Sequence, residues 1–261
     1  MESVFYKIKA LTNMHVGSGD TNYGVIDNLV QRDVVSDLPT IHGSSLKGAL
    51  REFFETKWGN NDNKLEYIFG KNEQAGKYRF LSAHLLAMPV RSNKKAFFMA
   101  TAPEAIKGIT TFMKELGKKK TPAFLNELKS LNPATGKPIV FVNKDDLQIE
   151  DFEDFEQKNV PFSPETKNAL NISDNLVIFS DEDFTQICGN TNLPVIARNK
   201  LGENKNLWYE QVVPRESVFW AAVILPESKQ HLTDFEAGFE DIVHIGANAS
   251  VGYGFTKISK I

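Results

Sequence analysis

The order of strand-type and helix-type patterns along the chain constrains its fold most strongly. Residues 4–10 alternate apolar and polar side chains, which predicts a half-buried strand. Residues 46–58 repeat apolar side chains every three or four positions, which predicts an amphipathic helix. Further strand patterns cover 78–91, 95–101 and 217–225, and further helix patterns cover 103–116 and 227–239. Because strands and helices mix without strict alternation, we expect an α+β fold rather than a doubly wound parallel sheet.

The chain length fits one large domain with additions. The sequence has 261 residues, within the range of a single domain or one with an insertion. The irregular stretch 115–175 is the expected insertion. Strand patterns at 195–200 and 207–213 flank a turn at 202–204, which predicts a long hairpin within about 193–213. A glycine-rich turn and a closing strand are expected over 248–261.

Charge and composition exclude several classes of protein. The net charge is −3, so a globally basic nucleic-acid coat is excluded, although a local basic groove is not. Removing the seven acids of residues 145–156 from the net −3 leaves +4 for the remaining chain. Cys188 is the only cysteine, so an intrachain disulfide and a cysteine-based zinc site are excluded. No apolar run approaches the roughly 20 residues that a membrane helix needs, and no signal peptide is visible, so we expect a cytoplasmic protein without membrane contact.

The start of the predicted helix has the features of an anion site. Gly43, Ser44 and Ser45 place main-chain N–H groups at a helix N-terminus, where Ser44 or Ser45 could also be the N-cap. Lys47 and Arg51 add positive charge one and two turns further on. A phosphate or a phosphodiester backbone is the ligand that this pattern favours. An ordinary capped helix with solvated cations explains the same residues equally well.

The loop before this helix carries the first candidate catalytic groups. His15 and Asp27 lie on a long glycine-containing segment that could support acid–base chemistry or hold a divalent cation. Loops of this length inside a compact domain are usually functional. The alternative is that the Asp and Asn residues of this segment make local turns to their own backbone.

A second glycine-rich loop and the predicted hairpin offer further contacts to nucleic acid. Gly252 and Gly254 would let backbone approach phosphates, and Tyr253 between them could stack on a base. On the hairpin, Arg198 and Lys200 are followed by aromatic residues at 208–209, which suits single-stranded nucleic acid. The alternatives are a tight turn at the glycines and core aromatics on the strands.

Together these segments resemble a known family. Residues 15–19, 26–28, 31–32 and 38–51 resemble the N-terminal signature of RAMP proteins, a CRISPR-associated superfamily, and residues 252–254 are similar to its glycine-rich loop. Residues 85–92, 97–98 and 207–210 narrow the resemblance to the backbone subunit of the type III-B (Cmr) effector.

The resemblance implies a ferredoxin-like (RRM-like) core with an inserted subdomain and a thumb hairpin. It implies that several copies stack in a helical filament along a CRISPR guide RNA beside other Cmr complex subunits. Each copy would cut complementary target RNA, as a metal-dependent endoribonuclease using Mg²⁺ or Mn²⁺. The family's catalytic aspartate corresponds to Asp27, as general base or metal ligand, and its histidine corresponds to His15. Glu210 is a further candidate acid.

In the light of this resemblance, three groups of residues become the expected RNA-binding set. They are the helix start with Gly43, Ser44, Ser45, Lys47 and Arg51, the hairpin residues Arg198 and Lys200, and the loop Gly252, Tyr253 and Gly254. Two alternatives remain at this point: a non-catalytic RNA-binding backbone, as in a type III-A relative, and a guide-processing endoribonuclease. Leu29 stands where the family pattern has proline, which bears on the stiffness of the loop rather than on its chemistry.

Overall fold

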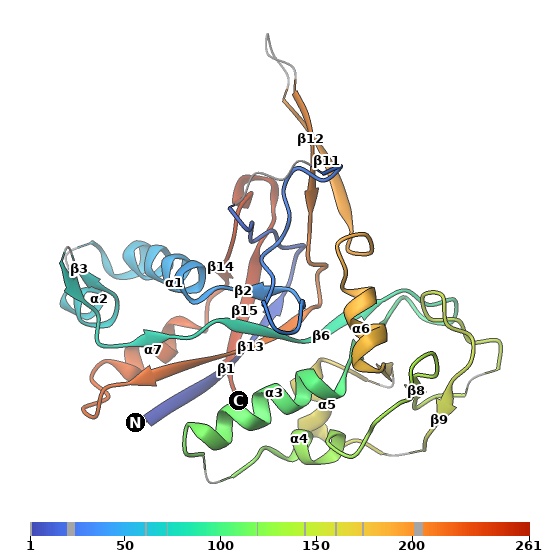
Figure 1. Cartoon of the computed structure of the whole chain (residues 1–261). Coiled ribbons are helices and arrows are strands. Elements are labelled where there is room, and N and C mark those ends of the chain that lie inside the picture. Colours follow the sequence, from blue (N-terminus) through green and yellow to red (C-terminus); the bar gives the residue numbers. More distant parts are fainter. Residues whose placement is uncertain are drawn as a thin grey trace.

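The chain folds around one large mixed β-sheet (Figure 1). The computed structural model describes residues 2–19, 24–60, 62–71, 73–118, 120–143, 145–159, 161–173, 175–200 and 206–261. The main strands follow the order β14-β15-β1-β13-β6-β7-β10-β8-β9. Their bounds are β1 (Glu2–Ala10), β6 (Ala83–Val90), β7 (Phe98–Thr101), β8 (Ile139–Val140), β9 (Glu156–Gln157), β10 (Leu176–Ile178), β13 (Val218–Leu225), β14 (Val243–His244) and β15 (Phe255–Lys260). Two short strands, β2 (Thr40–Ile41) and β5 (Arg79–Phe80), pair with β6 and β13.

The helices lie around this sheet. Their bounds are α1 (Gly43–Trp58), α2 (Asn63–Phe69), α3 (Pro103–Glu115), α4 (Ala123–Leu128), α5 (Pro164–Leu170), α6 (Asp181–Ile187) and α7 (Leu232–Gly238), with a 3₁₀ turn η1 (Ala249–Val251). A small hairpin of β3 (Gly70–Lys71) and β4 (Gln74–Ala75) follows α2. Among the described residues, no helix is both long and apolar enough to span a membrane.

The centre of the sheet has ferredoxin-like topology. In chain order the elements are β1, α1, β6, β13, α7 and β15, and the four strands lie side by side as β15-β1-β13-β6. All three neighbouring pairs are antiparallel, with Val4 opposite Val223 and Ile8 opposite Ile258. This is the βαββαβ arrangement of the ferredoxin-like fold. The predicted α+β class and its ferredoxin-like core are therefore confirmed.

Both faces of the sheet are covered, and the prediction of a half-buried first strand holds only for its second part. There, buried side chains alternate with the partly buried Lys7 and Lys9, whereas the first part is buried on both faces. On one face, α1 and α7 meet through Phe54 and Phe235, whose ring centroids are 5.2 Å apart. On the other face, Phe5 of β1 stacks on Trp220 of β13 at 6.1 Å, above the apolar sides of α3, α4 and α5. The N-terminal half of β1 is buried on both sides because strands on each edge of it and helices on each face enclose it.

The stretch 115–175 extends the sheet and packs on the same core. Its strands β8 and β9 prolong the edge beyond β10, and α4 and α5 join the apolar cluster that contains Phe5 and Trp220. Arg91 at the end of β6 holds Glu150 of this stretch through two nitrogens, at 2.9 and 2.6 Å. The predicted boundaries of an insertion remain a prediction.

Two helix predictions are corrected at their first turns. Helix α1 begins at Gly43 with His42 as N-cap, so neither Ser44 nor Ser45 is the cap. The helix expected over 227–239 begins only at Leu232, because Lys229 and His231 adopt positive φ angles of 48° and 67°. Left-handed residues interrupt an α-helix, so the polar residues 227–231 form turns before the helix begins.

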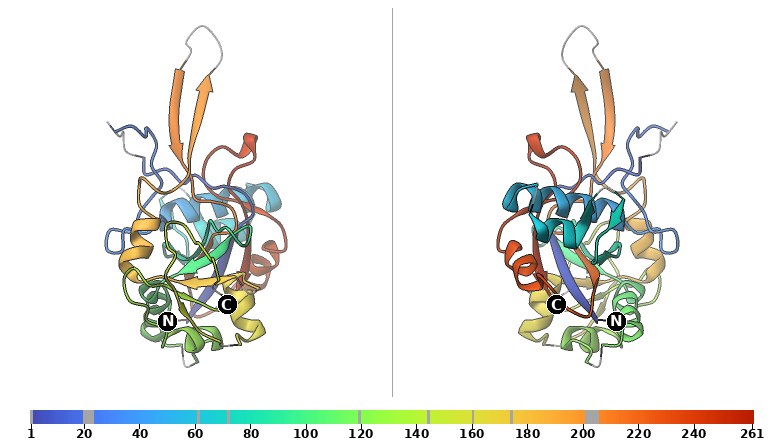
Figure 2. Two further views of the ribbon diagram at one scale, coloured as in Figure 1. Left: turned by 90° about the vertical axis from the view of Figure 1, so that its right-hand side faces the viewer. Right: turned by 90° about the vertical axis from the view of Figure 1, so that its left-hand side faces the viewer.

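The predicted hairpin is present and stands clear of the rest of the molecule (Figures 1 and 2). Strands β11 (Val195–Lys200) and β12 (Asn206–Gln211) pair antiparallel, with Val195 opposite Gln211. We refer to β11 and β12 as the thumb hairpin. The turn predicted at 202–204 lies outside the described residues.

Candidate functional site

Asp27 lies at the base of the thumb hairpin, beside β12. The main-chain N–H groups of Asp27 and Asn28 both donate to the Tyr209 carbonyl, at 3.1 Å each. In return, the Tyr209 N–H donates to Asp27 Oδ2 at 2.7 Å, and the Gln211 N–H donates to the Asn28 carbonyl at 2.9 Å. These bonds fix the position of the Asp27 carboxylate relative to the hairpin while its side chain stays exposed to solvent.

His15 lies under the same strand and is buried. Its Nδ1 is 2.6 Å from the Gln211 carbonyl oxygen. Because a carbonyl oxygen only accepts, Nδ1 is the donor in this hydrogen bond. A Cβ added at Gly17 would lie 3.1 Å from His15 Nε2, so the glycine loop covers this nitrogen closely. His15 therefore supports β12 through its hydrogen bond to the main chain of Gln211. Its predicted catalytic role remains a prediction.

Glu210 is a buried connecting point rather than a free acid. Only 6% of the residue is exposed. Its Oε1 accepts from Trp208 Nε1 at 3.0 Å and from Asn28 Nδ2 at 3.4 Å. Its Oε2 accepts from Arg198 Nε and from Asn248 Nδ2, both at 2.9 Å. The carboxylate thus joins both thumb strands to the Asp27 segment and to the glycine-rich loop.

These donors also decide the charge state of Glu210. Burial raises the pKa of its carboxyl, but the hydrogen bonds from Trp208 and Arg198 outweigh burial and hold the pKa below the usual value. The sequence did not predict this arrangement. Its members lie far apart along the chain, and only the topology brings them together.

Arg198 and Tyr253 join the thumb to the glycine-rich loop. The Arg198 guanidinium lies 4.4 Å from the centroid of the Tyr253 ring, a cation–π contact. Gly252 and Gly254 on either side have φ angles of 85° and 73°. A Cβ at Gly254 would lie 2.3 Å from the Ile245 carbonyl oxygen, whereas a Cβ at Gly252 would meet no heavy atom within 4 Å. Lys200 is the last residue of β11, and its side chain lies outside the described part of the structure.

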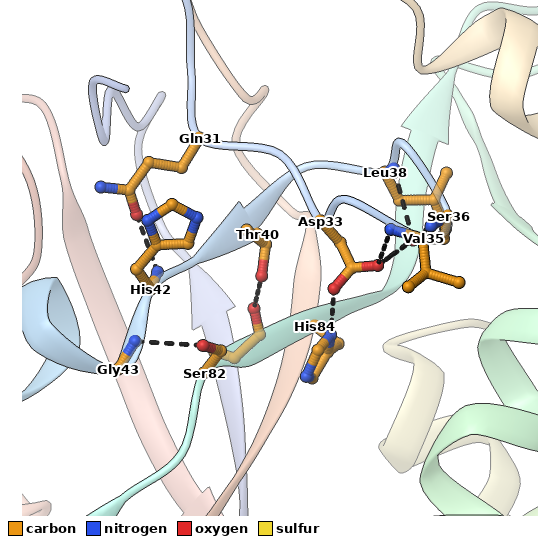
Figure 3. Close-up of polar contacts among 11 residues, drawn as sticks. Gln31, Asp33, Val35, Ser36, Leu38, Thr40, His42, Gly43, Ser82 and His84 are labelled. Atoms are coloured by element: carbon orange, nitrogen blue, oxygen red, sulfur yellow. Dashed lines mark hydrogen bonds and ion pairs between the residues drawn. The ribbon is translucent and has the colours of Figure 1, made fainter. Parts of the chain in front are cut away.

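The start of α1 presents main-chain donors (Figure 3). Helix α1 has no side-chain N-cap, and the Gly43 N–H donates to Ser82 Oγ at 3.1 Å. A Cβ at Gly43 would lie 2.6 Å from the Phe80 carbonyl oxygen, which explains the glycine. The exposed Ser44 and the half-buried Ser45 follow in the first turn. This geometry fits an anion at the helix N-terminus.

The two predicted cations of α1 differ in their surroundings. Lys47 makes no ion pair within the part of the chain that the structure describes. Arg51, by contrast, donates through Nε to Glu55 Oε1 at 2.7 Å and through Nη1 to the Gly70 carbonyl at 2.6 Å. Its guanidinium is therefore already engaged inside the fold, and Lys47 is the better placed of the two to meet a phosphate.

Gln31 connects the His15 loop to α1, a role that the sequence did not reveal. Its Nε2 donates to the Gly17 carbonyl at 3.0 Å and to Ser45 Oγ at 2.9 Å. Its Oε1 accepts from the His42 N–H at 2.7 Å (Figure 3). A polar side chain buried in this way fixes the two loops relative to each other. Its place in the quoted family signature, at residues 31–32, was the only signal available in the sequence.

Comparison with known proteins identifies the family. A family model of the RAMP superfamily matches residues 7–257. The chain belongs to the RAMP superfamily. Among curated RAMP relatives, the CRISPR system Cmr endoribonuclease Cmr4 of Pyrococcus furiosus is 27% identical over 99% of this chain and 96% of its own length. The CRISPR system CMR subunit Cmr4 of Saccharolobus solfataricus is 23% identical over 96% of this chain and 94% of its own length.

Solved RAMP structures share the fold. A type III-B Cmr-beta structure in the apo state matches with a TM-score of 0.82 and 23% identity, covering 99% of this chain and 97% of the other. The Cmr-beta complex bound to cognate target RNA matches with a TM-score of 0.81 and 21% identity, covering 100% and 97%. Oligomeric Cmr4 from Pyrococcus furiosus gives a TM-score of 0.72 and 20% identity, covering 100% and 99%.

The donor set of this RAMP chain limits how a metal ion could bind. Within the described residues, no three His, Cys, Asp or Glu side chains gather as a ligand set. Asp27 offers one exposed carboxylate. Mg²⁺ is often bound by one or two carboxylates together with substrate phosphates and water. The residues present therefore fit an ion shared with an RNA phosphate, and they do not fit an all-protein cage.

Proposed function

We propose that this chain is a guide-RNA-binding backbone subunit of a type III-B CRISPR effector that cleaves target RNA paired to the guide. The relatives support this: one is named as a Cmr endoribonuclease, one structure contains cognate target RNA, and one is oligomeric. Its partners would be the guide RNA, the target RNA, further copies of this chain in a filament, and other Cmr subunits. The effector would act in the cytoplasm.

The observation that carries the proposal is the fixed carboxylate of Asp27. Main-chain bonds to Tyr209 hold it at the base of a hairpin that projects from the molecule (Figure 2). A projecting hairpin can separate neighbouring nucleotides and so distort the phosphodiester linkage between them. The fixed carboxylate beside the hairpin then lies next to this linkage. Orientation of this kind lowers the barrier to in-line attack.

RNA would lie along the surface that joins three anchoring points. The first is the uncapped start of α1 with Lys47, the second is the glycine-rich loop at 252–254, and the third is the thumb hairpin with Arg198. Main-chain donors and scattered cations read phosphates rather than bases. Base pairing to the guide would supply sequence specificity, so the protein needs only to recognise backbone and shape.

The reaction class is transesterification within the target strand. The ribose 2′-oxygen attacks the adjacent phosphorus, the bond from phosphorus to the 5′-oxygen breaks, and a 2′,3′-cyclic phosphate and a 5′-hydroxyl result. Asp27 would take the proton of the 2′-hydroxyl as general base, and the leaving 5′-oxygen would take a proton from solvent water. In the alternative role Asp27 would instead hold a Mg²⁺ or Mn²⁺ ion together with phosphate oxygens, and the ion would supply charge neutralisation.

The test compares Asp27→Asn and Asp27→Ala with wild type in the reconstituted complex, with Mg²⁺ and with a chelator. We expect regularly spaced cuts to fall by about 10²–10⁴-fold in both variants while target binding is retained. Asparagine keeps an oxygen for the Tyr209 N–H, so the loop should hold its shape. Glu153→Gln, an exposed acid on the 115–175 stretch, is the matched control and should cut normally.

Two outcomes would contradict the proposal in different ways. Unchanged cutting by the Asp27 variants would leave this chain a non-catalytic RNA-binding backbone. Metal-independent cutting of precursor guide RNA by a single copy would instead identify a guide-processing endoribonuclease.

A further inference from the structure

Gln211 is the last residue of β12, and it is fully buried at the base of the thumb hairpin. Its main-chain N–H donates to the Asn28 carbonyl at 2.9 Å, and its main-chain carbonyl accepts from His15 Nδ1 at 2.6 Å. Its side chain makes two further hydrogen bonds. Oε1 accepts from the Val30 N–H at 3.2 Å, and Nε2 donates to the Asn190 carbonyl at 3.0 Å. This one residue therefore contacts three separate segments of the chain.

The segment 27–30 lies beside β12 as a short parallel strand. Asn28 makes the bridge: its N–H donates to the Tyr209 carbonyl at 3.1 Å, and its carbonyl accepts from the Gln211 N–H at 2.9 Å. Parallel strands repeat such bonds at even spacing along the pair. The next bond in this register would run from the Val30 N–H to the main-chain carbonyl of Gln211.

The His15 ring binds that carbonyl instead, and the side chain of Gln211 takes its place as the acceptor. Val30 is 3% exposed, and a main-chain N–H that is buried needs an acceptor inside the fold. Oε1 of Gln211 is that acceptor. The carboxamide therefore continues the ladder past the point where His15 interrupts it.

The carboxamide of Gln211 has a defined orientation. The Val30 N–H only donates and the Asn190 carbonyl only accepts, so Oε1 and Nε2 cannot exchange places. Asn190 is itself fixed, because its side-chain Oδ1 accepts from Arg32 Nε at 2.8 Å. A buried polar side chain with both polar atoms bonded holds its neighbours rigidly. Gln211 therefore fixes how the segment 27–30 lies along β12.

We propose that Gln211 is a positioning residue for the Asp27 carboxylate. The carboxylate accepts from the Tyr209 N–H at 2.7 Å, a bond that forms only while the segment 27–30 keeps its register on β12. Gln211 holds that register from the other end of the segment, through Val30. It is fully buried, so it acts on the reaction without contacting RNA. The inference rests on the proposed function, in which Asp27 acts on the target RNA.

Gln211→Met tests this role in the reconstituted complex. Methionine has nearly the same length and fills the buried space, but it has neither the oxygen nor the amide nitrogen that the contacts need. The single-turnover rate of target cutting should fall about 10–100-fold, because a displaced catalytic group loses its alignment with the reacting atoms. The affinity for guide and target RNA should be unchanged, since Gln211 does not reach the surface.

Thr101→Val on β7 is the matched control. Thr101 is also fully buried, and its Oγ1 donates to the Leu86 carbonyl of β6 at 2.7 Å, so this variant likewise loses a buried side-chain bond to the main chain. It should cut at the wild-type rate, even if its unfolding midpoint falls as far as that of Gln211→Met. Hydrogen exchange of the full chain gives a readout that does not depend on cutting. The amides of residues 27–31 should exchange faster in Gln211→Met and not in Thr101→Val.

A second change tests the same bond from its other side. Replacing the amide of Val30 by an ester removes this N–H and leaves every side chain in place. It should slow cutting by about tenfold or more with unchanged RNA affinity, and it decides the question if Gln211→Met fails to assemble.

Three outcomes would overturn the positioning role. The first is wild-type cutting by Gln211→Met or by the Val30 ester in complexes in which Asp27→Ala does not cut, and it would leave the proposed function intact. The second is equal slowing by Gln211→Met and Thr101→Val, which would attribute the loss to stability alone. The third is normal cutting by Asp27→Ala, which would overturn the proposed function together with this inference.

Discussion

Arg198 and Glu210 form an ion pair between the two strands of the thumb hairpin, with Nε 2.9 Å from Oε2. The same guanidinium lies over the Tyr253 ring, and the same carboxylate accepts from Asn28 beside Asp27. One buried pair therefore sets the hairpin relative to both loops of the site. Movement of the hairpin as a whole would have to break the contacts of this pair to Asn28, Asn248 and Tyr253, so the base of the thumb is the stiff part of the projection.

Replacing the buried carboxylate tests this connecting point. Glu210→Gln should lower the free energy of unfolding by about 2 kcal/mol, because Arg198 loses its charged partner and an amide nitrogen faces other donors. Denaturant titration measures the change. Glu227→Gln, at an exposed position after β13, is the control and should change stability by less than about 0.5 kcal/mol. Equal stability of the two variants would contradict the connecting role.

The same pair predicts a pH dependence of stability. The pKa of Glu210 lies below its usual 4.5, since the hydrogen bonds from Trp208 and Arg198 outweigh burial. A carboxyl whose pKa is lowered by folding contributes stability above its unfolded pKa and loses it as the pH falls through the folded value. The gap in unfolding free energy between wild type and Glu210→Gln should thus be constant near neutrality. It should shrink below pH 4.5, as unfolding measured between about pH 3 and pH 7 would reveal.

The two glycines around Tyr253 predict a graded effect. Gly252→Ala should cost about 1 kcal/mol, because alanine disfavours the positive φ but meets open space. Gly254→Ala should cost clearly more, because its Cβ would also press on the Ile245 carbonyl. Thermal and denaturant unfolding of the two variants give the comparison. Equal costs would mean that the loop relaxes freely and does not hold Tyr253 under Arg198.

The two cations of α1 should separate binding from stability. Lys47→Ala should weaken guide-RNA binding and reduce the salt dependence by about one phosphate contact, with little change in stability. Arg51→Ala should lower stability by about 1 kcal/mol, since it loses Glu55 and the Gly70 carbonyl, and should affect RNA binding less. Binding titrations at several salt concentrations, with parallel unfolding curves, check both. If Arg51→Ala reduced the salt dependence of guide-RNA binding more than Lys47→Ala did, Arg51 rather than Lys47 would be the phosphate contact.

Elements with a strong local pattern could be predicted from the sequence. The stripe of α1, the proline at the start of α3 and the two strands of the thumb each lie within a few residues of where the patterns put them. Two-residue strands such as β8 and β9 carry no period, and only neighbouring strands define them. Left-handed residues at Lys229 and His231 likewise delay the start of α7 to Leu232, which the polar sequence before it does not reveal.

The residues of the candidate site also fall into two groups, those that a sequence motif reveals and those that only the fold brings together. Asp27 and the start of α1 are visible as motifs because their residues are contiguous in the sequence. The bonds that position them are not visible, since Gln31 joins two loops and Glu210 joins four segments only after the sheet has formed. Side chains that act across the fold have no local signature. For this reason the sequence indicates Glu210 only as a candidate catalytic acid and does not reveal the connecting role of Gln31.

The sheet order also has a consequence for synthesis of the chain on the ribosome. Strand β1 lies between β13 and β15, and the main-chain N–H of Tyr209 holds the Asp27 carboxylate in position. Strand β1 therefore cannot take its place in the sheet until β13 and β15, which are translated later, are available. A nascent chain has neither a closed core nor a positioned carboxylate, so the site is set only once nearly all of this stretch has left the exit tunnel.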